Sequence, residues 1–101
     1  MSITIGNYSF EGPFGNTGDL RNHSGVYAIL SRRTNADRYT VIDIGEAGQV
    51  GDRIANHDRQ DQWRRNNHGT LAVAALYCDE AARMRIEREL RAQYNPVCGV
   101  R

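Results

Sequence analysis

Lysine is absent from this 101-residue sequence, and all 13 of its basic residues are arginine. Twelve acidic residues leave a formal net charge of +1, so the composition gives no overall attraction to nucleic acid or to an anionic membrane. Arginine suits bidentate contact with phosphate, but an arginine-rich codon usage explains the same bias. Charge alone therefore does not identify the partner.

Cysteine and histidine are too few and too scattered for a structural zinc site. Cys78 and Cys98 lie 20 positions apart, and only three histidines accompany them. We expect reduced, structural thiols. No apolar run approaches the roughly 20 residues of a membrane-spanning helix, and the first residues lack the basic and apolar regions of a secretory signal. We therefore expect a cytoplasmic protein without a membrane partner.

The length fits a single domain with one modest core. Residues 6–25 contain five of the ten glycines, together with Pro13, and this composition is typical of turns. We expect one domain over residues 1–101. A glycine-rich N-terminal extension covers 1–23, with a short peripheral strand beginning near Ile3, and the core covers 24–98.

Three strands are predicted in this core. Residues 25–30 and 39–45 are rich in β-branched and aromatic side chains, and the polar stretch between them favours an antiparallel hairpin. Residues 71–78 form a short continuous apolar run, which is typical of a buried central strand.

Two helical segments alternate with these strands. Residues 49–65 are expected to be helical with a break, because Val50 and Ile54 form an i, i+4 apolar pair. Asp79 is a suitable N-cap for a helix over 80–94, and Asn95-Pro96 ends it. The fold class is therefore α/β (α+β): a small, partly antiparallel three-stranded sheet flanked by helices, in the order β-β-α-β-α.

Four motifs in this order resemble those of the GIY-YIG nuclease family. They are Gly25-Val26-Tyr27 on the first strand, Asp43-Ile44-Gly45 on the second, the helical segment Val50–His57, and Ile86–Leu90 followed by Tyr94-Asn95-Pro96. The resemblance covers residues 24–98, and the predicted element order is similar to that of the family core. Each motif alone is weak, but their joint order is much more specific.

The resemblance implies metal-dependent endonucleolytic hydrolysis of DNA. It gives catalytic roles to Tyr27, Arg53, His57 and Glu87, and it places one Mg²⁺ or Mn²⁺ ion on Glu87. To the catalytic candidates we add Asp43, and as candidate substrate-binding residues we take Arg53, His68 and Asn95. The chemistry of three of these residues fits their roles. Arg53 is always charged and can stabilise a phosphoryl transition state, and Glu87 offers the oxygen ligand that a hard cation needs. Tyr27 would position or activate the attacking water.

The sequence also departs from the family pattern. Asp43 replaces the second motif tyrosine, and Glu46 replaces a lysine that often follows the second glycine. An asparagine of the family would align with Gly99. Asp43 either acts as a base or metal ligand in a modified site, or it marks a degenerate one.

Three hypotheses remain open at this point. The first is a DNA endonuclease, acting alone, as a homodimer or with a partner subunit. The second is a catalytically inactive module of the same fold that binds nucleic acid or a protein, and the third is an unrelated α/β interaction domain. If the resemblance holds, we expect Tyr27, Arg53 and Glu87 to converge on one cleft.

Overall fold

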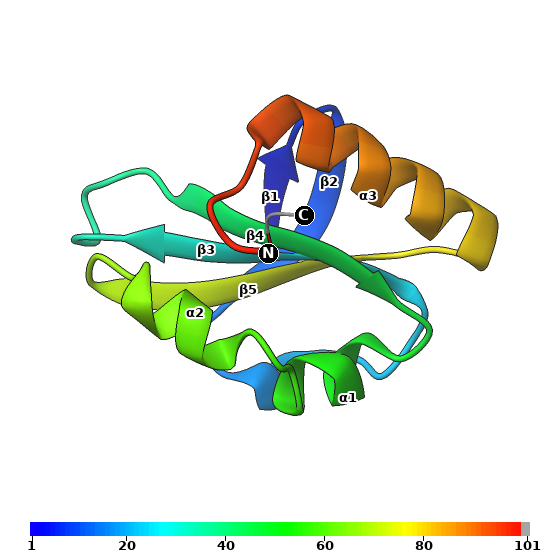
Figure 1. The fold of residues 1–101 in the computed structure, drawn as a ribbon, viewed down its shortest axis with the longest axis horizontal. Helices are drawn as coiled ribbons and strands as arrows, with labels where there is room; N and C mark the ends of the chain where they lie inside the picture. Colours follow the sequence, from blue (N-terminus) through cyan, green and yellow to red (C-terminus); the bar gives the residue numbers. More distant parts are fainter. Residues whose placement is uncertain (100–101) are drawn as a thin grey trace.

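The computed structural model describes residues 1–99, which form a five-stranded antiparallel sheet packed against helices (Figure 1). The strands lie in the order β1-β2-β5-β3-β4. The elements are β1 (Ser2–Ile5), β2 (Tyr8–Phe14), a 3-10 turn η1 (Thr17–Asp19), β3 (Gly25–Arg32), β4 (Thr40–Ala47), α1 (Val50–Ala55), α2 (Gln60–Arg65), β5 (Thr70–Tyr77) and α3 (Glu80–Tyr94). The predicted α+β class is confirmed, whereas the predicted three-stranded sheet is too small.

The additional strands come from the N-terminal segment, which was expected to be an extension with one short strand. Gly6, with a φ of 62°, turns the chain between β1 and β2, and β2 then pairs with β5. The register of that pairing shifts between Glu11 and Phe14, where Pro13 removes a backbone donor. Phe10 of β2 is fully buried. Residues 1–23 therefore supply part of the same sheet and core.

From Gly25 onward the elements follow the predicted order, including the break in the first helical segment. Two short helices, α1 and α2, stand where residues 49–65 were expected to be helical with a break. The single long helix α3 matches the prediction: the Asp79 side chain accepts a hydrogen bond from the Ala82 amide, and Asn95 adopts a left-handed conformation at its end.

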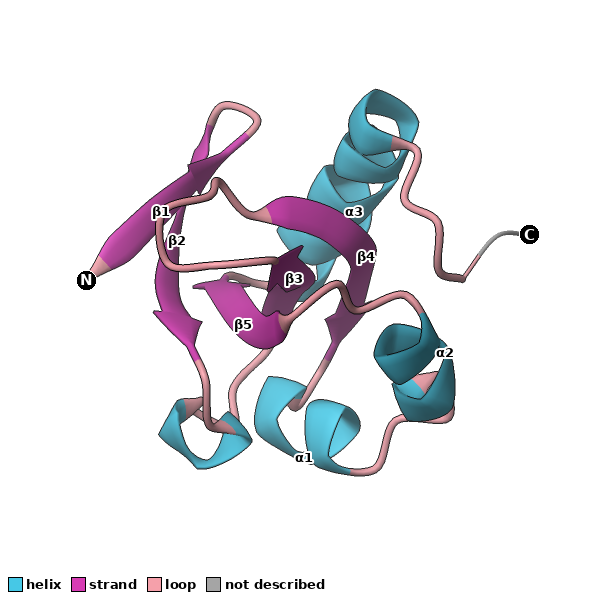
Figure 2. Cartoon of the chain, turned by 90° about the vertical axis from the view of Figure 1, so that its left-hand side faces the viewer, coloured by secondary structure: helices cyan, strands magenta, loops and turns pink. Residues whose placement is uncertain are grey.

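Helices cover both faces of the sheet, with α3 on one face and α1 and α2 on the other (Figures 1 and 2). Alternate side chains of β3 divide between these two layers, as the period of two of a strand requires. Val26, Ala28 and Leu30 pack with Ile86 and Leu90 of α3. In contrast, Tyr27 and Ile29 pack with Val50, Ile54 and Trp63 of α1 and α2. Tyr27 and α3 are consequently separated by the sheet.

Within residues 1–99, none of the helices has the length and apolar character needed to cross a membrane.

Candidate active site

Tyr27 lies in the centre of β3, and its side chain is buried on the face covered by α1 and α2. Its hydroxyl oxygen is 2.6 Å from Nε2 of His57. The hydroxyl also lies directly against the backbone of Gly45 on β4, since a Cβ atom built there would be only 2.1 Å away. Glycine at position 45 is therefore what allows the Tyr27 ring to occupy this position.

His57 follows the end of α1, and its imidazole side chain is completely buried. Burial, together with the positive charges of Arg53 and Arg59, lowers the pKa of His57 to about 4, so the ring is neutral at neutral pH. Its Nδ1 atom is 3.0 Å from the amide nitrogen of Arg59 and 3.2 Å from a carboxylate oxygen of Asp58.

Only the tautomer with the proton on Nε2 keeps both hydrogen bonds, because a proton on Nδ1 leaves the Arg59 amide without its acceptor. With the proton on Nε2, His57 donates to Tyr27 and accepts from the Arg59 amide at Nδ1. With the proton on Nδ1, it donates to Asp58 and accepts from the Tyr27 hydroxyl at Nε2. The second tautomer links Tyr27, His57 and Asp58 in one hydrogen-bonded chain that ends at the exposed Asp58 carboxylate.

Arg53 of α1 lies beside this chain and is more exposed than Arg59, the other cation near Tyr27. Its guanidinium donates to Asp58 at 3.0 Å, and its side chain is 42% exposed. Burial raises the pKa of Tyr27 to about 12, while the charges of Arg59 and Arg53 oppose that rise. The phenol is therefore protonated at neutral pH. The structure thus brings together three of the predicted catalytic residues, Tyr27, Arg53 and His57.

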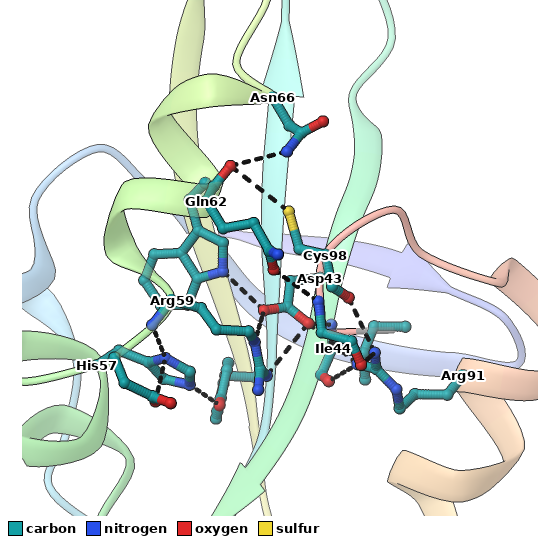
Figure 3. Close-up of polar contacts among 12 residues, drawn as sticks. Asp43, Ile44, His57, Arg59, Gln62, Asn66, Arg91 and Cys98 are labelled. Carbon is teal, nitrogen blue, oxygen red and sulfur yellow. Dashed lines mark hydrogen bonds and ion pairs between the residues drawn. The ribbon is translucent and has the colours of Figure 1, made fainter. Parts of the chain in front are cut away.

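Asp43 is the centre of a buried charge network at the edge of the sheet (Figure 3). Its Oδ2 atom accepts hydrogen bonds from Arg59 Nε at 2.8 Å and Trp63 Nε1 at 2.7 Å. Its Oδ1 atom accepts from Arg91 Nη1 at 3.0 Å and from the amide of Ile44 at 2.8 Å. Burial alone would raise the pKa of Asp43, but the hydrogen bonds from Arg59, Trp63 and Arg91 outweigh it and lower the pKa.

These contacts give Asp43 a different environment from the one expected of a base or metal ligand. Both carboxylate oxygens are occupied, and the residue is fully buried. Asp43 joins β4 to the α1–α2 segment through Arg59 and to α3 through Arg91. Its role in the structure is to hold these elements together, and we give it no step in the chemistry.

Sequence analysis missed the partners of Asp43, although one signal pointed to them. Asp43 stands between Ile42 and Ile44 in the middle of a predicted strand. A carboxylate at such a position has to be paired with cationic or hydrogen-bonding groups. Asp58 was expected only as a surface ion-pair partner of Arg53, and its contact with the buried His57 ring was not predicted.

Glu87 does not share a cleft with Tyr27, so the expected convergence is wrong for this residue, and this position counts against the GIY-YIG resemblance. It lies on α3, across the sheet from Tyr27. There it lines a surface pocket of about 210 Å³ together with Glu46, the residue that follows Gly45. The Glu46 carboxylate also accepts a hydrogen bond from Arg83 Nε at 2.6 Å.

The predicted substrate-binding residues occupy three separate places. Arg53 lies beside Tyr27, whereas Asn95 lines a pocket of about 310 Å³ with Glu87 at the end of α3. His68 lies in another pocket, at the loop end of the β3–β4 hairpin. The described residues therefore do not form one continuous substrate cleft.

The metal expectation can be tested against the side chains that the structure brings together. Residues 1–99 contain no cluster of three or more metal-ligating side chains. Magnesium, however, is commonly held by one or two carboxylates, with water and substrate oxygens completing its shell. Glu46 and Glu87 offer that limited donor set, in a pocket that Arg88 also lines and with the Glu46 carboxylate already paired to Arg83.

Comparison with known proteins gave no match: no family model, curated protein or solved structure matches this chain.

Proposed function

We propose that this protein is a metal-dependent endonuclease that hydrolyses DNA phosphodiester bonds at a GIY-YIG-type site. The observation that carries the proposal is the 2.6 Å contact between the Tyr27 hydroxyl and His57 Nε2, with Arg53 beside it. These three residues occupy the family-like motif positions, and they come from a strand, a helix and the segment that follows it. Their convergence supports a shared chemical role.

The proton path requires the second tautomer of His57, in which the Arg59 amide loses its acceptor. Tyr27 accepts a proton from the attacking water as it passes its own proton to His57 Nε2, and Asp58 stabilises the imidazolium through Nδ1. The phenol, with a pKa of about 12, is protonated at rest, whereas the low pKa of His57, about 4, opposes the transfer of its proton to the ring. The exposed guanidinium of Arg53 then stabilises the charge that develops on the phosphoryl oxygens.

Glu87 and Glu46 are the residues that would hold the divalent cation. The ion supplies positive charge to the phosphate and the leaving oxygen. β4 is an outer strand of the sheet. Its residue Gly45 contacts the Tyr27 hydroxyl, and the next residue, Glu46, lines the pocket that contains Glu87. Consecutive strand residues point to opposite faces of the sheet, so a substrate phosphate would have to bind at the exposed edge of β4 to contact both groups.

A second candidate is a catalytically inactive module that binds nucleic acid or a protein partner. Its support is the burial of Tyr27, which is 2% exposed, together with the position of Glu87 across the sheet. A substrate can reach the phenol only if α1 and the following segment move away from β4. In this candidate the Tyr27–His57 contact stabilises the fold alone.

The test is nicking of supercoiled plasmid with Mg²⁺, with Mn²⁺ and with a chelator. We expect metal-dependent nicking by the wild type, a decrease on the order of 10²–10³ for Arg53→Ala, and loss of activity for Glu87→Gln. Arg85→Ala, which removes an exposed arginine of α3, is the matched control and should retain activity. Absence of nicking with either metal would overturn the nuclease proposal and favour the inactive module. Full activity of Arg53→Ala would refute the assigned site.

A further inference from the structure

A second polar pocket, of about 280 Å³, lies at the loop end of the β3–β4 hairpin and takes no part in the mechanism above. Four segments contribute to it: the end of β3, the hairpin loop, the start of β4 and the turn that precedes β5. Its charged residues are Arg32, Arg33, Arg38 and His68, with Asp37 as the single acid. Guanidinium groups therefore outnumber carboxylates by three to one.

Arg32 is held in position but uses its hydrogen-bonding capacity poorly. Its guanidinium lies over the Tyr39 ring, 4.2 Å from the ring centre, which fixes the plane of the group. Its Nη atoms reach Asn35 only at 3.4 and 3.5 Å, and its buried Nε atom has no hydrogen-bond partner within residues 1–99. An orphaned buried donor is costly, so an acceptor in this pocket would stabilise the site.

The other charged side chains of the pocket do not neutralise this excess of positive charge. Arg33 and Arg38 are exposed and form no ion pair with any residue of the described part. One oxygen of Asp37 accepts hydrogen bonds from the amide and hydroxyl of Thr34, at 3.1 and 3.2 Å. The acid therefore organises the hairpin loop, and none of the three arginines is paired with it.

The turn that carries His68 is fixed against the end of β3. Gly69 passes so close that a Cβ atom there would lie 2.6 Å from the carbonyl oxygen of Arg33. The His68 amide donates to Ser31 Oγ at 3.0 Å, and that hydroxyl donates to Asn67 Oδ1 at 2.8 Å. The backbone at His68 is thus placed beside the arginines by contacts that do not need a ligand.

We propose that this pocket binds a phosphate group. A planar guanidinium matches the oxygens of a phosphate in a bidentate way, and several of them around one polar hollow favour an oxyanion over an apolar ligand. The phosphate can belong to a nucleic-acid backbone or can be free in solution. Only the nucleic-acid source rests on the function proposed above.

The position of the pocket suits a backbone phosphate of the same DNA. Ser31 follows Tyr27 by four residues on β3, which is about 13 Å at roughly 3.3 Å per residue. A duplex rises about 3.4 Å per base pair. The pocket and Tyr27 therefore lie within the length of one short duplex, close enough for both to contact the same DNA.

The experiment measures binding of the full chain to a fluorescent DNA duplex by anisotropy, in chelator, over a series of salt concentrations. We expect the double variant Arg33→Ala/Arg38→Ala to bind on the order of tenfold more weakly. The slope of log affinity against log salt should decrease by roughly two, about 0.9 for each lost contact. Arg85→Ala is again the matched control and should bind as the wild type does. Both altered arginines are exposed, so circular dichroism should show an intact fold.

A second arm titrates inorganic phosphate and follows the ring resonances of His68 by NMR. Shifts in the wild type that are lost in the double variant support the phosphate site. If they occur while duplex binding is unchanged, the ligand is a free phosphate and not a DNA backbone. If neither duplex nor phosphate binding responds to the double variant, the proposal is overturned. Because binding is measured without metal, absence of cleavage refutes only the nuclease proposal.

Discussion

Replacing Asp43 by asparagine is the most informative perturbation of this fold, because it removes a charge while keeping the shape. The groups that contact its two oxygens are all donors: Arg59, Trp63, Arg91 and the Ile44 amide. The amide group of an asparagine therefore faces a donor in either orientation. Two partly buried guanidinium groups also lose the carboxylate that compensates them.

The expected loss of stability is large. Removing one partner of a buried ion pair costs about 3–5 kcal/mol, whereas a whole domain is stable by only about 5–15 kcal/mol. For a domain of this size, each kcal/mol corresponds to about 4–8 °C in Tm. Asp43→Asn should therefore lower Tm by at least about 12 °C.

Urea and thermal unfolding followed by circular dichroism provide the measurement. The matched control is Asp61→Asn, because Asp61 pairs with Arg64 but its side chain is 81% exposed. The control should lose less than about 1 kcal/mol. If Asp43→Asn unfolds within 1 kcal/mol of the wild type, as a rough limit, the network does not hold β4 to the helices and our reasoning about Asp43 is wrong.

Three further predictions concern the residues around this network. The pKa of His57 is about 4 in the folded state, against an ordinary value of 6.5. Between pH 6.5 and pH 4 the unfolded state therefore binds more protons than the folded state, and the free energy of unfolding decreases as the pH falls. Urea titrations should show a loss of roughly 2 kcal/mol from about pH 7 to about pH 5, and an equal loss in His57→Gln would contradict the assignment. Gly45→Ala should cost about 1–3 kcal/mol in thermal unfolding, since its Cβ atom would overlap the Tyr27 hydroxyl; a neutral effect would show that the ring is not held there. Trp63→Phe removes the 2.7 Å hydrogen bond to Asp43 and should cost about 1.5–3 kcal/mol, and wild-type stability of this variant would refute the contribution of that bond.

The sequence predicted the elements whose signals are local. β3, β4 and β5 contain β-branched or continuous apolar runs, and α3 carries an apolar stripe between an aspartate cap and an Asn-Pro end. Their predicted bounds agree with the structure to within a few residues. For these segments, side-chain periodicity and helix capping were sufficient.

The N-terminal hairpin was not predicted for a physical reason. Gly6, Gly12 and Pro13 are turn residues, and their density concealed the second of the two strands. β2 becomes a strand of this sheet because its backbone pairs with the free edge of β5. The residues that pair are far apart in the chain. A local sequence pattern does not contain that information.

The candidate site was predicted in part for a similar reason. Arg53 and His57 lie four residues apart, so their proximity follows from local geometry, and the resemblance added Tyr27. The contacts of Asp43 with Arg59 and Arg91 join residues 16 and 48 positions apart. The sequence around an arginine does not show which distant carboxylate it binds. The placement of Glu87 and Tyr27 on opposite faces of the sheet likewise depends on contacts between residues that are far apart in the chain.

Because β2 pairs with β5, the N-terminal hairpin stays unpaired on that side until the ribosome has synthesised β5. Glu11 pairs with Ala75, 64 positions later in the chain. At about 5–20 residues per second, the ribosome needs roughly 3–13 seconds to make that interval. Ile5 and Phe10, which are buried in the finished sheet, have no β5 or α3 to pack against during this time. The β1–β2 hairpin is therefore the segment of the nascent chain that most needs protection from aggregation.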